Sequence, residues 1–165
     1  MLFRSPEELQ AELNIPLLAT IGMMEMADDI DTDAVTGMEG VHMWTQADDA
    51  ASESFRTIRT VLVMGTAESQ RIAISSSEPG DGKTTLSTNL AIAYQQAGKR
   101  VLIIDADMRK PGLTKLIAGK GLPGLSDILR SDDPITGAAL AAVRQSGDVP
   151  VDIIPADRKS TRLNS

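Results

Sequence analysis

A glycine-rich turn with one lysine is the part of this sequence best suited to chemistry. Ser75–Thr85 reads SSSEPGDGKTT and joins a short β-branched segment to a segment of helical length. Gly80 and Gly82 allow the backbone to curl closely around phosphate oxygens, and N–H groups at a helix N-terminus attract anions. Lys83 can reach the β- and γ-phosphates of a nucleotide, and Thr84 can place its hydroxyl on Mg²⁺. The turn therefore predicts a nucleotide-binding loop.

This loop departs from the usual pattern at one position. The common pattern has a glycine six residues before the lysine, and this chain has Ser77 there. The strand expected before the turn and the helix expected after it supply the context that the motif requires. An ordinary strand-to-helix turn rich in serine and glycine is the alternative. The predicted nucleotide-binding residues are Pro79, Gly80, Asp81, Gly82, Lys83, Thr84 and Thr85.

Two aspartates form a second candidate group. Asp105 ends the apolar run VLIID, and Asp107 follows two residues later. Ligands of open α/β sheets bind at the carboxyl ends of the strands. Two carboxylates there can hold Mg²⁺ or accept a proton from an attacking hydroxyl, while Arg109 and Lys110 could neutralise phosphate charge. The alternative is a strand end with solvated charges.

Hydrophobic spacing predicts the elements that would position these groups. The segment between Arg71 and Asp105 reads strand, helix, strand, which predicts two parallel strands joined by a right-handed crossover. Gly22–Ser52 is acidic and lacks a period, so we interpret it as a linker. The predicted helices are Pro6–Leu13, Glu53–Met64, Lys83–Ala97, Leu125–Leu129 (with Ser126 as a candidate cap) and Ile135–Val143, and the predicted strands are Ile15–Ile21, Arg71–Ser75, Arg100–Asp105 and Val149–Ile154.

Composition excludes several classes of protein. The chain has 165 residues, enough for one packed domain, and only 2% are aromatic, so aliphatic residues must fill its core. It has no cysteine and one histidine, His42, which excludes disulfides, thiolate metal sites and a histidine-built zinc site. The net charge of -7 argues against nucleic-acid binding. No apolar run approaches the roughly 20 residues that span a bilayer.

Taken together, these motifs resemble the bacterial tyrosine kinases called BY-kinases. Ser76–Thr84 resembles their Walker A pattern S-x-x-P-G-[DE]-G-K-[ST], and residues 105–111 resemble their Walker A′ pattern D-A-D-x-R-x-P. Pro123–Leu129 resembles the segment that follows Walker A′ in that family. A third motif, E-x-x-R-x-x-R, is matched by Glu53, Arg56 and Arg59, which spacing alone would place as a solvated charged stripe on a helix.

The resemblance implies a fold and an activity. The fold would be α/β, a P-loop NTPase-type parallel sheet flanked by helices. The activity would be transfer of the ATP γ-phosphoryl group, with Mg²⁺, to tyrosines on a neighbouring subunit's tail. Lys83 would contact the phosphates, Thr84 and Asp105 would serve Mg²⁺, and Asp107 would activate the tyrosine hydroxyl, although the two aspartates could exchange roles. Glu53, Arg56 and Arg59 would join subunits into a ring.

The resemblance also implies a cellular role. Pro6–Gly22 is similar to the stretch after the second membrane span in fused members of the family. The parent would be an autokinase on the cytoplasmic side of the bacterial inner membrane that controls chain length and export of exopolysaccharide or capsule. It would work with the polymerisation and export machinery. Neither the polysaccharide nor the ring size can be read from these residues.

We expect this sequence to be incomplete. Residues 1–5 and 157–165 resemble translated sequencing adapters, which leaves a juxtamembrane segment and acidic linker at 6–52 and a kinase domain at 53–156. The Walker B strand and the tyrosine-rich tail should lie beyond Ala156. The single tyrosine, Tyr94, should pack or lie on a helix surface, so this fragment alone should be inactive.

Two other functions remain open at this point. One is an ATPase of the chromosome-partition or division-site type, which carries a second lysine early in Walker A. Glu78 stands at that position here, which argues against this function. The other is a non-catalytic assembly module that uses nucleotide only to set its oligomeric state.

Overall fold

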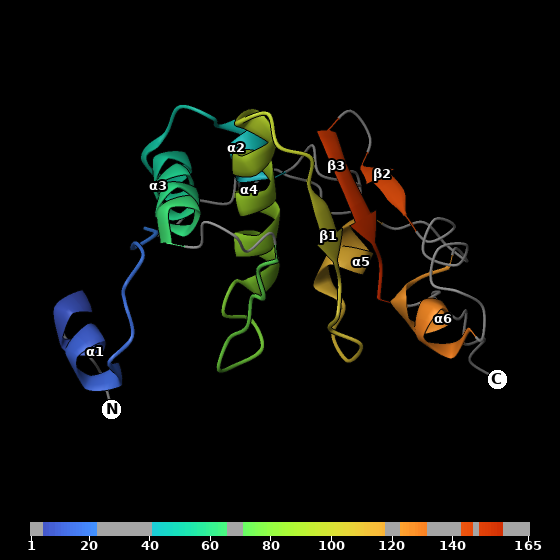
Figure 1. Ribbon diagram of the computed structural model, residues 1–165, viewed down its shortest axis with the longest axis horizontal. Coiled ribbons are helices and arrows are strands. Elements are labelled where there is room, and N and C mark those ends of the chain that lie inside the picture. The colour runs from blue at the N-terminus through green and yellow to red at the C-terminus, as the bar shows by residue number, and fades with distance from the viewer. Residues whose placement is uncertain are drawn as a thin grey trace.

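The computed structural model describes residues 5–22, 41–65, 71–117, 123–131, 143–146 and 149–156. The N-terminal helices lie to one side of a small sheet, the helix that follows the glycine-rich turn is the one nearest the strands, and the last helix lies beyond the sheet on its other side (Figure 1). The helices are α1 (Pro6–Leu13), α2 (His42–Thr45), α3 (Ala50–Gly65), α4 (Lys83–Gln96), α5 (Gly112–Ile117) and α6 (Leu125–Arg130), and the strands are β1 (Leu102–Ile104), β2 (Arg144–Ser146) and β3 (Val149–Ile154).

The sheet has the order β1-β3-β2. β1 and β3 are parallel, with Ile103 opposite Ile153, whereas β2 and β3 are antiparallel. The main-chain N–H of Asp105 donates to Ile154 O at 2.9 Å, so the ladder continues to the carboxyl end of β1. The predicted α/β class with a parallel strand pair and flanking helices is confirmed.

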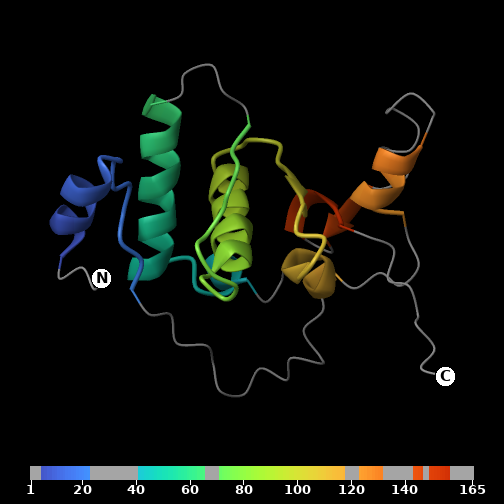
Figure 2. The same ribbon diagram turned by 90° about the horizontal axis from the view of Figure 1, so that it is seen from below.

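Helix α4 is the centre of the packing. Six consecutive residues, 88–93, are buried, which requires neighbours on every side of the helix. Figure 2 shows α3 along one side of α4 and the sheet beyond its other side. Asn89 is 1% exposed and accepts a hydrogen bond from Met43 N at 2.7 Å, which fastens α2 to α4.

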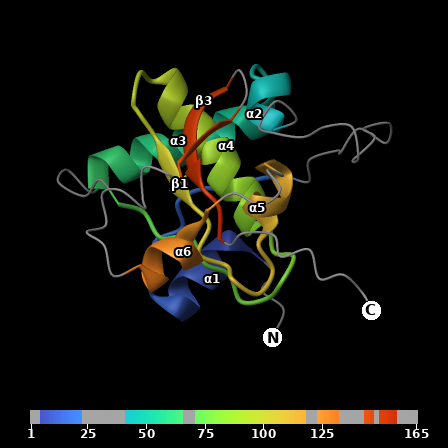
Figure 3. The ribbon, with the colours of Figure 1, turned by 90° about the vertical axis from the view of Figure 1, so that its right-hand side faces the viewer.

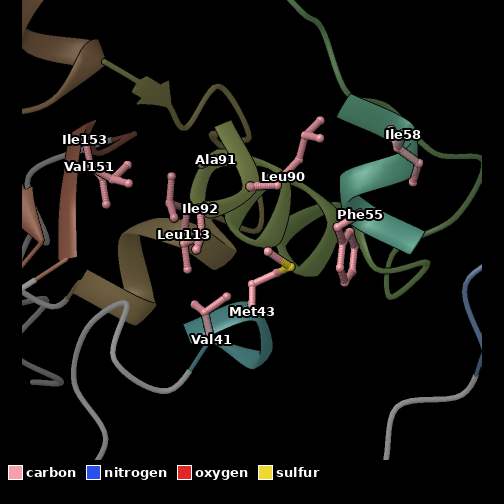
Figure 4. Close-up of a cluster of buried hydrophobic side chains, with 11 residues drawn as sticks. Val41, Met43, Phe55, Ile58, Leu90, Ala91, Ile92, Leu113, Val151 and Ile153 are labelled. Atoms are coloured by element: carbon pink, nitrogen blue, oxygen red, sulfur yellow. The ribbon is translucent and has the colours of Figure 1, made fainter. Parts of the chain in front are cut away.

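The core draws side chains from α2, α3, α5 and β3 around α4 (Figure 4). Phe55 and Ile58 come from α3, as their helical spacing predicted, and Leu62 packs partly against the same cluster. Val61, on the same helix, is 39% exposed. The buried hydrophobic residues of the cluster are Val41, Met43, Phe55, Ile58, Leu90, Ala91, Ile92, Ala93, Leu113, Val151 and Ile153.

The interpretation of Gly22–Ser52 as a linker is wrong for residues 41–52. Met43 is fully buried on α2, and α3 already begins at Ala50. Asp49 connects the two helices, because Oδ1 accepts from Ser52 N at 2.8 Å while Oδ2 lies 2.6 Å from His42 Nε2. The backbone bond from Ser52 lowers the pKa of Asp49 most, and His42 adds to that effect.

Two predicted strands are absent from the sheet. Ile15–Ile21 and Arg71–Ser75 have no strand structure, so the predicted strand–helix–strand unit lacks its first strand. β1 pairs in parallel with β3. Although β1 is a continuous apolar run, Leu102 and Ile104 are each 49% exposed. A β-branched run forms a strand only where a neighbour supplies ladder hydrogen bonds, and periodicity does not reveal that neighbour.

Other predicted elements agree with the structure within a few residues. α1 begins after Ser5, whose hydroxyl accepts from Glu8 N at 3.2 Å, and ends at Asn14 in the left-handed region. β3 matches its predicted bounds, and α4 ends one residue before Ala97. α6 is capped at Gly124, whose N–H donates to Asp127 Oδ2 at 3.0 Å, and Ser126 is not the cap.

One predicted helix cannot be compared with the structure, and two observed elements were not predicted. The helix predicted at Ile135–Val143 lies outside the described residues except for Val143, which is not helical. α5 and β2 were not predicted from the sequence. Within the described parts of the chain, no helix is both long enough and apolar enough to cross a bilayer.

Candidate functional site

The predicted phosphate loop leads directly into α4. Gly80 has φ 99° and Gly82 has φ 81°, in the left-handed region where side chains are disfavoured. Gly82 is the N-cap of α4, and its carbonyl accepts from Leu86 N at 2.8 Å. The two glycines therefore turn the chain so that α4 starts at Lys83 with its N–H groups facing the loop.

Asp81 holds the loop in shape. Its Oδ2 accepts hydrogen bonds from Glu78 N at 2.8 Å and from Ser77 Oγ at 3.0 Å. The backbone bond from Glu78 lowers the pKa of Asp81 most, followed by the Ser77 hydroxyl, and the Lys83 charge lowers it further. Ser77, which stands where the usual pattern has glycine, thus contributes a hydrogen bond inside the loop.

Hydrogen bonds hold the Lys83 side chain within its own loop. Its Nζ donates to Ser76 Oγ at 2.8 Å and lies 3.4 Å from Glu78 O. The Lys83 charge also helps to lower the pKa of Asp107, after the larger effect of the Lys110 backbone N–H.

Asp105 is buried and fully oriented. It is 7% exposed, and its Oδ2 accepts from both Thr114 N and Thr114 Oγ1 at 2.8 Å. Its Oδ1 accepts from Asp107 N at 3.1 Å. A carboxylate with this many donors is fixed in direction before any ligand arrives.

Asp107 is more accessible and is held by its own turn. Its Oδ1 accepts from Lys110 N at 2.9 Å and from Arg109 N at 3.2 Å, so these two residues act on it through their main chains. The same bonds lower its pKa, which keeps the carboxylate ionised at neutral pH.

Thr84 lies against the start of α5. A Cβ added to Gly112 would overlap the Thr84 hydroxyl, so the two elements approach as closely as glycine permits. Figure 3 shows α5 alongside α4. Asp105 is bound to Thr114, two residues after Gly112, so the first turn of α5 contacts both the Thr84 hydroxyl and the Asp105 carboxylate.

This donor set fits a magnesium ion held together with phosphates. Mg²⁺ in nucleotide sites binds one or two protein oxygens and completes its shell with water and phosphate oxygens. Thr84 and Asp105 offer a hydroxyl and a carboxylate from neighbouring elements. Among the described residues there is no group of three or more His, Cys, Asp or Glu side chains that could hold a metal by itself.

Three residues of the site were missed by sequence reasoning. Ser76 supports Lys83, Thr114 binds Asp105, and Gly112 gives room to Thr84. The contacts of Gly112 and Thr114 depend on packing between separate elements, and their sequence neighbourhood carries no signal for them. Pro79 and Thr85, both predicted nucleotide-binding residues, are exposed at the loop and the first turn of α4.

The charged motif on α3 makes contacts within the chain. Arg56 pairs with Glu53 at 3.2 Å, as the spacing predicted, and also donates to Ala47 O. Arg59 turns toward α4 and donates to Ala93 O at 2.8 Å. That carbonyl lies in the last turn of α4, where carbonyls lack helical partners and cations are favoured.

Tyr94 lies in the last turn of α4. Its side chain is partly buried against the core, and burial raises its pKa while the nearby Arg59 charge opposes that rise. The prediction that this tyrosine packs on the helix is confirmed.

Sequence comparison adds to this geometry. Residues 72–131 match the family described as CobQ/CobB/MinD/ParA nucleotide binding domain. The chain is 34% identical over 124 residues to tyrosine-protein kinase YwqD of Bacillus subtilis, covering 72% of this chain and 52% of that protein. It is 33% identical over 145 residues to tyrosine-protein kinase wzc of Salmonella typhimurium, covering 82% of this chain and 20% of that protein.

The relatives of this chain are bacterial tyrosine kinases. The kinase domain of the Escherichia coli tyrosine kinase ETK superposes with a TM-score of 0.73 at 26% identity, covering 95% of this chain and 60% of that domain. The succinoglycan biosynthesis transport protein ExoP of Rhizobium meliloti is 40% identical over 80 residues, covering 47% of this chain and 10% of that protein. The resemblance stated from the motifs is thereby confirmed. The chain spans about half or less of each of these curated relatives.

Proposed function

We propose that this chain is the nucleotide-binding part of a protein-tyrosine autokinase. The observation that carries the proposal is that Thr84 of the loop and Asp105 of the strand end both contact the first turn of α5. The relatives named as tyrosine-protein kinases support the same activity. The intact protein would transfer the ATP γ-phosphoryl group to tyrosines on a neighbouring subunit's tail.

The residues have distinct tasks in this reaction. The loop from Pro79 to Gly82 and the first N–H groups of α4 surround the phosphates, and Lys83 neutralises their charge. Thr84 and Asp105 would hold Mg²⁺, which supplies charge stabilisation to the transferred group when bound. Asp107 orients the tyrosine hydroxyl and accepts its proton. Its lowered pKa makes it a weak base, so its contribution is mainly positioning.

The relatives support a proposal for where in the cell the protein acts. ExoP is named a succinoglycan biosynthesis transport protein, which supports a role in exopolysaccharide or capsule chain length and export. We place the kinase on the cytoplasmic side of the bacterial inner membrane, attached through a segment upstream of α1. Its other partners would be the polysaccharide polymerisation and export machinery.

Lys83→Met in the full-length protein tests the activity. Loss of the charge on the phosphates should reduce autophosphorylation by about 10²-fold or more. The measurement is phosphotyrosine formed from ATP and Mg²⁺, with Lys99→Met as a control because Lys99 is an exposed lysine beyond the end of α4. ATP hydrolysis without phosphotyrosine in the unmodified protein would instead indicate a partition-type ATPase. Nucleotide-dependent sizing without either activity would indicate an assembly module.

The ring assembly is tested separately. Arg56→Ala with Arg59→Ala should leave monomers that still bind nucleotide, as measured by light scattering after size exclusion. Arg59 also binds Ala93 O, so the double variant should unfold at a somewhat lower temperature. Glu53→Gln, which removes one charge of the motif at an exposed position, separates assembly from that packing contact. A ring that persists in both variants would contradict the assignment.

A further inference from the structure

The first turn of α5 touches both oxygen groups that we assign to Mg²⁺. Thr114 binds the Asp105 carboxylate twice, through its N–H and its hydroxyl, each at 2.8 Å. Gly112 lies against the Thr84 hydroxyl.

The direction of the Thr114 hydroxyl bond is determined by a third residue. Ala156 N donates to Thr114 Oγ1 at 2.7 Å, and a main-chain N–H can only donate. The oxygen of Thr114 is therefore an acceptor toward Ala156, and its single hydrogen points to Asp105 Oδ2. Thr114 is 9% exposed, so water cannot easily replace it in this chain of bonds.

Gly112 is required for its size and not for its backbone conformation. Its φ lies outside the left-handed region, since the positive-φ glycines among the described residues are Gly80, Gly82 and Gly98. A side chain at position 112 would meet the Thr84 hydroxyl at a distance that real Cβ atoms do not adopt. The threonine would have to rotate its hydroxyl away from its present position.

We infer that the first turn of α5 positions the metal-binding oxygens of this site, with Thr114 as a positioning residue for Asp105 and Gly112 as the space for the Thr84 hydroxyl. This inference rests on the proposed function, because it assigns a role toward the same nucleotide and Mg²⁺. Partners that orient metal-binding carboxylates typically change metal affinity by about 10- to 100-fold when removed.

The experiment measures how strongly Mg²⁺ tightens nucleotide binding. A fluorescent ATP analogue is titrated into the full-length protein in Mg²⁺ and in EDTA, and the ratio of the two dissociation constants is compared between variants. Thr114→Val removes the hydroxyl at nearly constant shape and should lower that ratio about tenfold, while binding in EDTA stays within about twofold. Thr114→Ser keeps the hydroxyl and should retain the ratio of the unmodified protein.

Gly112→Ala is the second test variant, and unlike Thr114→Val it removes no buried hydrogen bond. It should lower the same ratio about tenfold, because the Thr84 hydroxyl is displaced while the loop and Lys83 are unchanged. Ser52→Ala removes a buried hydroxyl far from the site, and Gly65→Ala adds a Cβ where nothing lies within 4 Å. Both controls should keep the unmodified ratio. Thermal unfolding shows which variants fold.

The possible results distinguish failure of the positioning role from failure of the proposed kinase function. An unchanged ratio in folded Thr114→Val and Gly112→Ala overturns the positioning role while leaving the kinase proposal intact. If Thr114→Val does not fold, an unchanged ratio in Gly112→Ala alone overturns it. If the unmodified protein binds no nucleotide, the proposed function fails, and the positioning role fails with it.

Discussion

The two halves of the candidate site are held by different kinds of contact. The phosphate loop is held by neighbours in sequence, as when Asp81 binds Ser77 and Glu78, and those residues are exposed. Asp105 is buried and held by Thr114, nine residues away, and through it by Ala156. The comparison shows a loop that can adjust to its ligand and a carboxylate that the tertiary structure orients in advance.

The largest effect on stability should come from a change at Asp105, the buried part of the site. Asp105→Asn replaces one carboxylate oxygen with an NH₂ group, which is a donor. That group would meet another donor at either position, Thr114 or the Asp107 N–H, so at least one hydrogen bond is lost. We expect the free energy of unfolding to fall by about 1–3 kcal/mol, measured by denaturant unfolding. Asp107→Asn changes an accessible carboxylate in the same motif and should leave stability nearly unchanged. Equal destabilisation by both would contradict the contrast between the two aspartates.

A smaller effect, on nucleotide affinity, should follow from a change in the exposed phosphate loop. Asp81→Ala removes the acceptor for Ser77 and Glu78, so the loop should sample more conformations before binding. Nucleotide affinity should fall several-fold while the unfolding temperature is unchanged, as measured by fluorescence titration and calorimetry. Asp48→Ala, which also removes an exposed carboxylate, serves as the control. A large drop in unfolding temperature would show that the loop is part of the core structure.

The smallest effect concerns pH. The pKa values of Asp81 and Asp107 are lowered from an ordinary value of 3.8 by backbone hydrogen bonds. A lowered folded-state pKa means that their stabilising contribution is present above the unfolded value and is lost as pH falls through the folded value. Both carboxylates should therefore titrate below pH 3.8 by carbon-detected NMR. Midpoints at or above that value would show that these bonds do not persist in solution.

The same contrast explains what could be predicted from the sequence. The loop, α4 and the Glu53–Arg56 pair depend on local spacing, and each was found at its predicted place. Thr114 was missed because its role depends on a residue 42 positions later in the chain. Met43 was missed because α2 is only 4 residues long, too short to show a period, although its side chain is fully buried.

Strands were predicted less well than helices for a related reason. Val149–Ile154 was recognised correctly, whereas the similar run Arg71–Ser75 is not in the sheet. A helix satisfies its hydrogen bonds within its own segment, but a strand needs a partner that the run itself does not specify. The half-exposed faces of Leu102 and Ile104 illustrate the same dependence, because burial of β1 also requires neighbours.

The bond between Ala156 and Thr114 has a consequence for biosynthesis. A ribosome makes the phosphate loop and both aspartates well before it adds Ala156, and domains begin to fold during synthesis. The nascent chain can form the loop and α4 at that stage, but Asp105 lacks its final orientation until β3 has left the exit tunnel. The order of synthesis thus delays assembly of the acidic half until the sheet is in place.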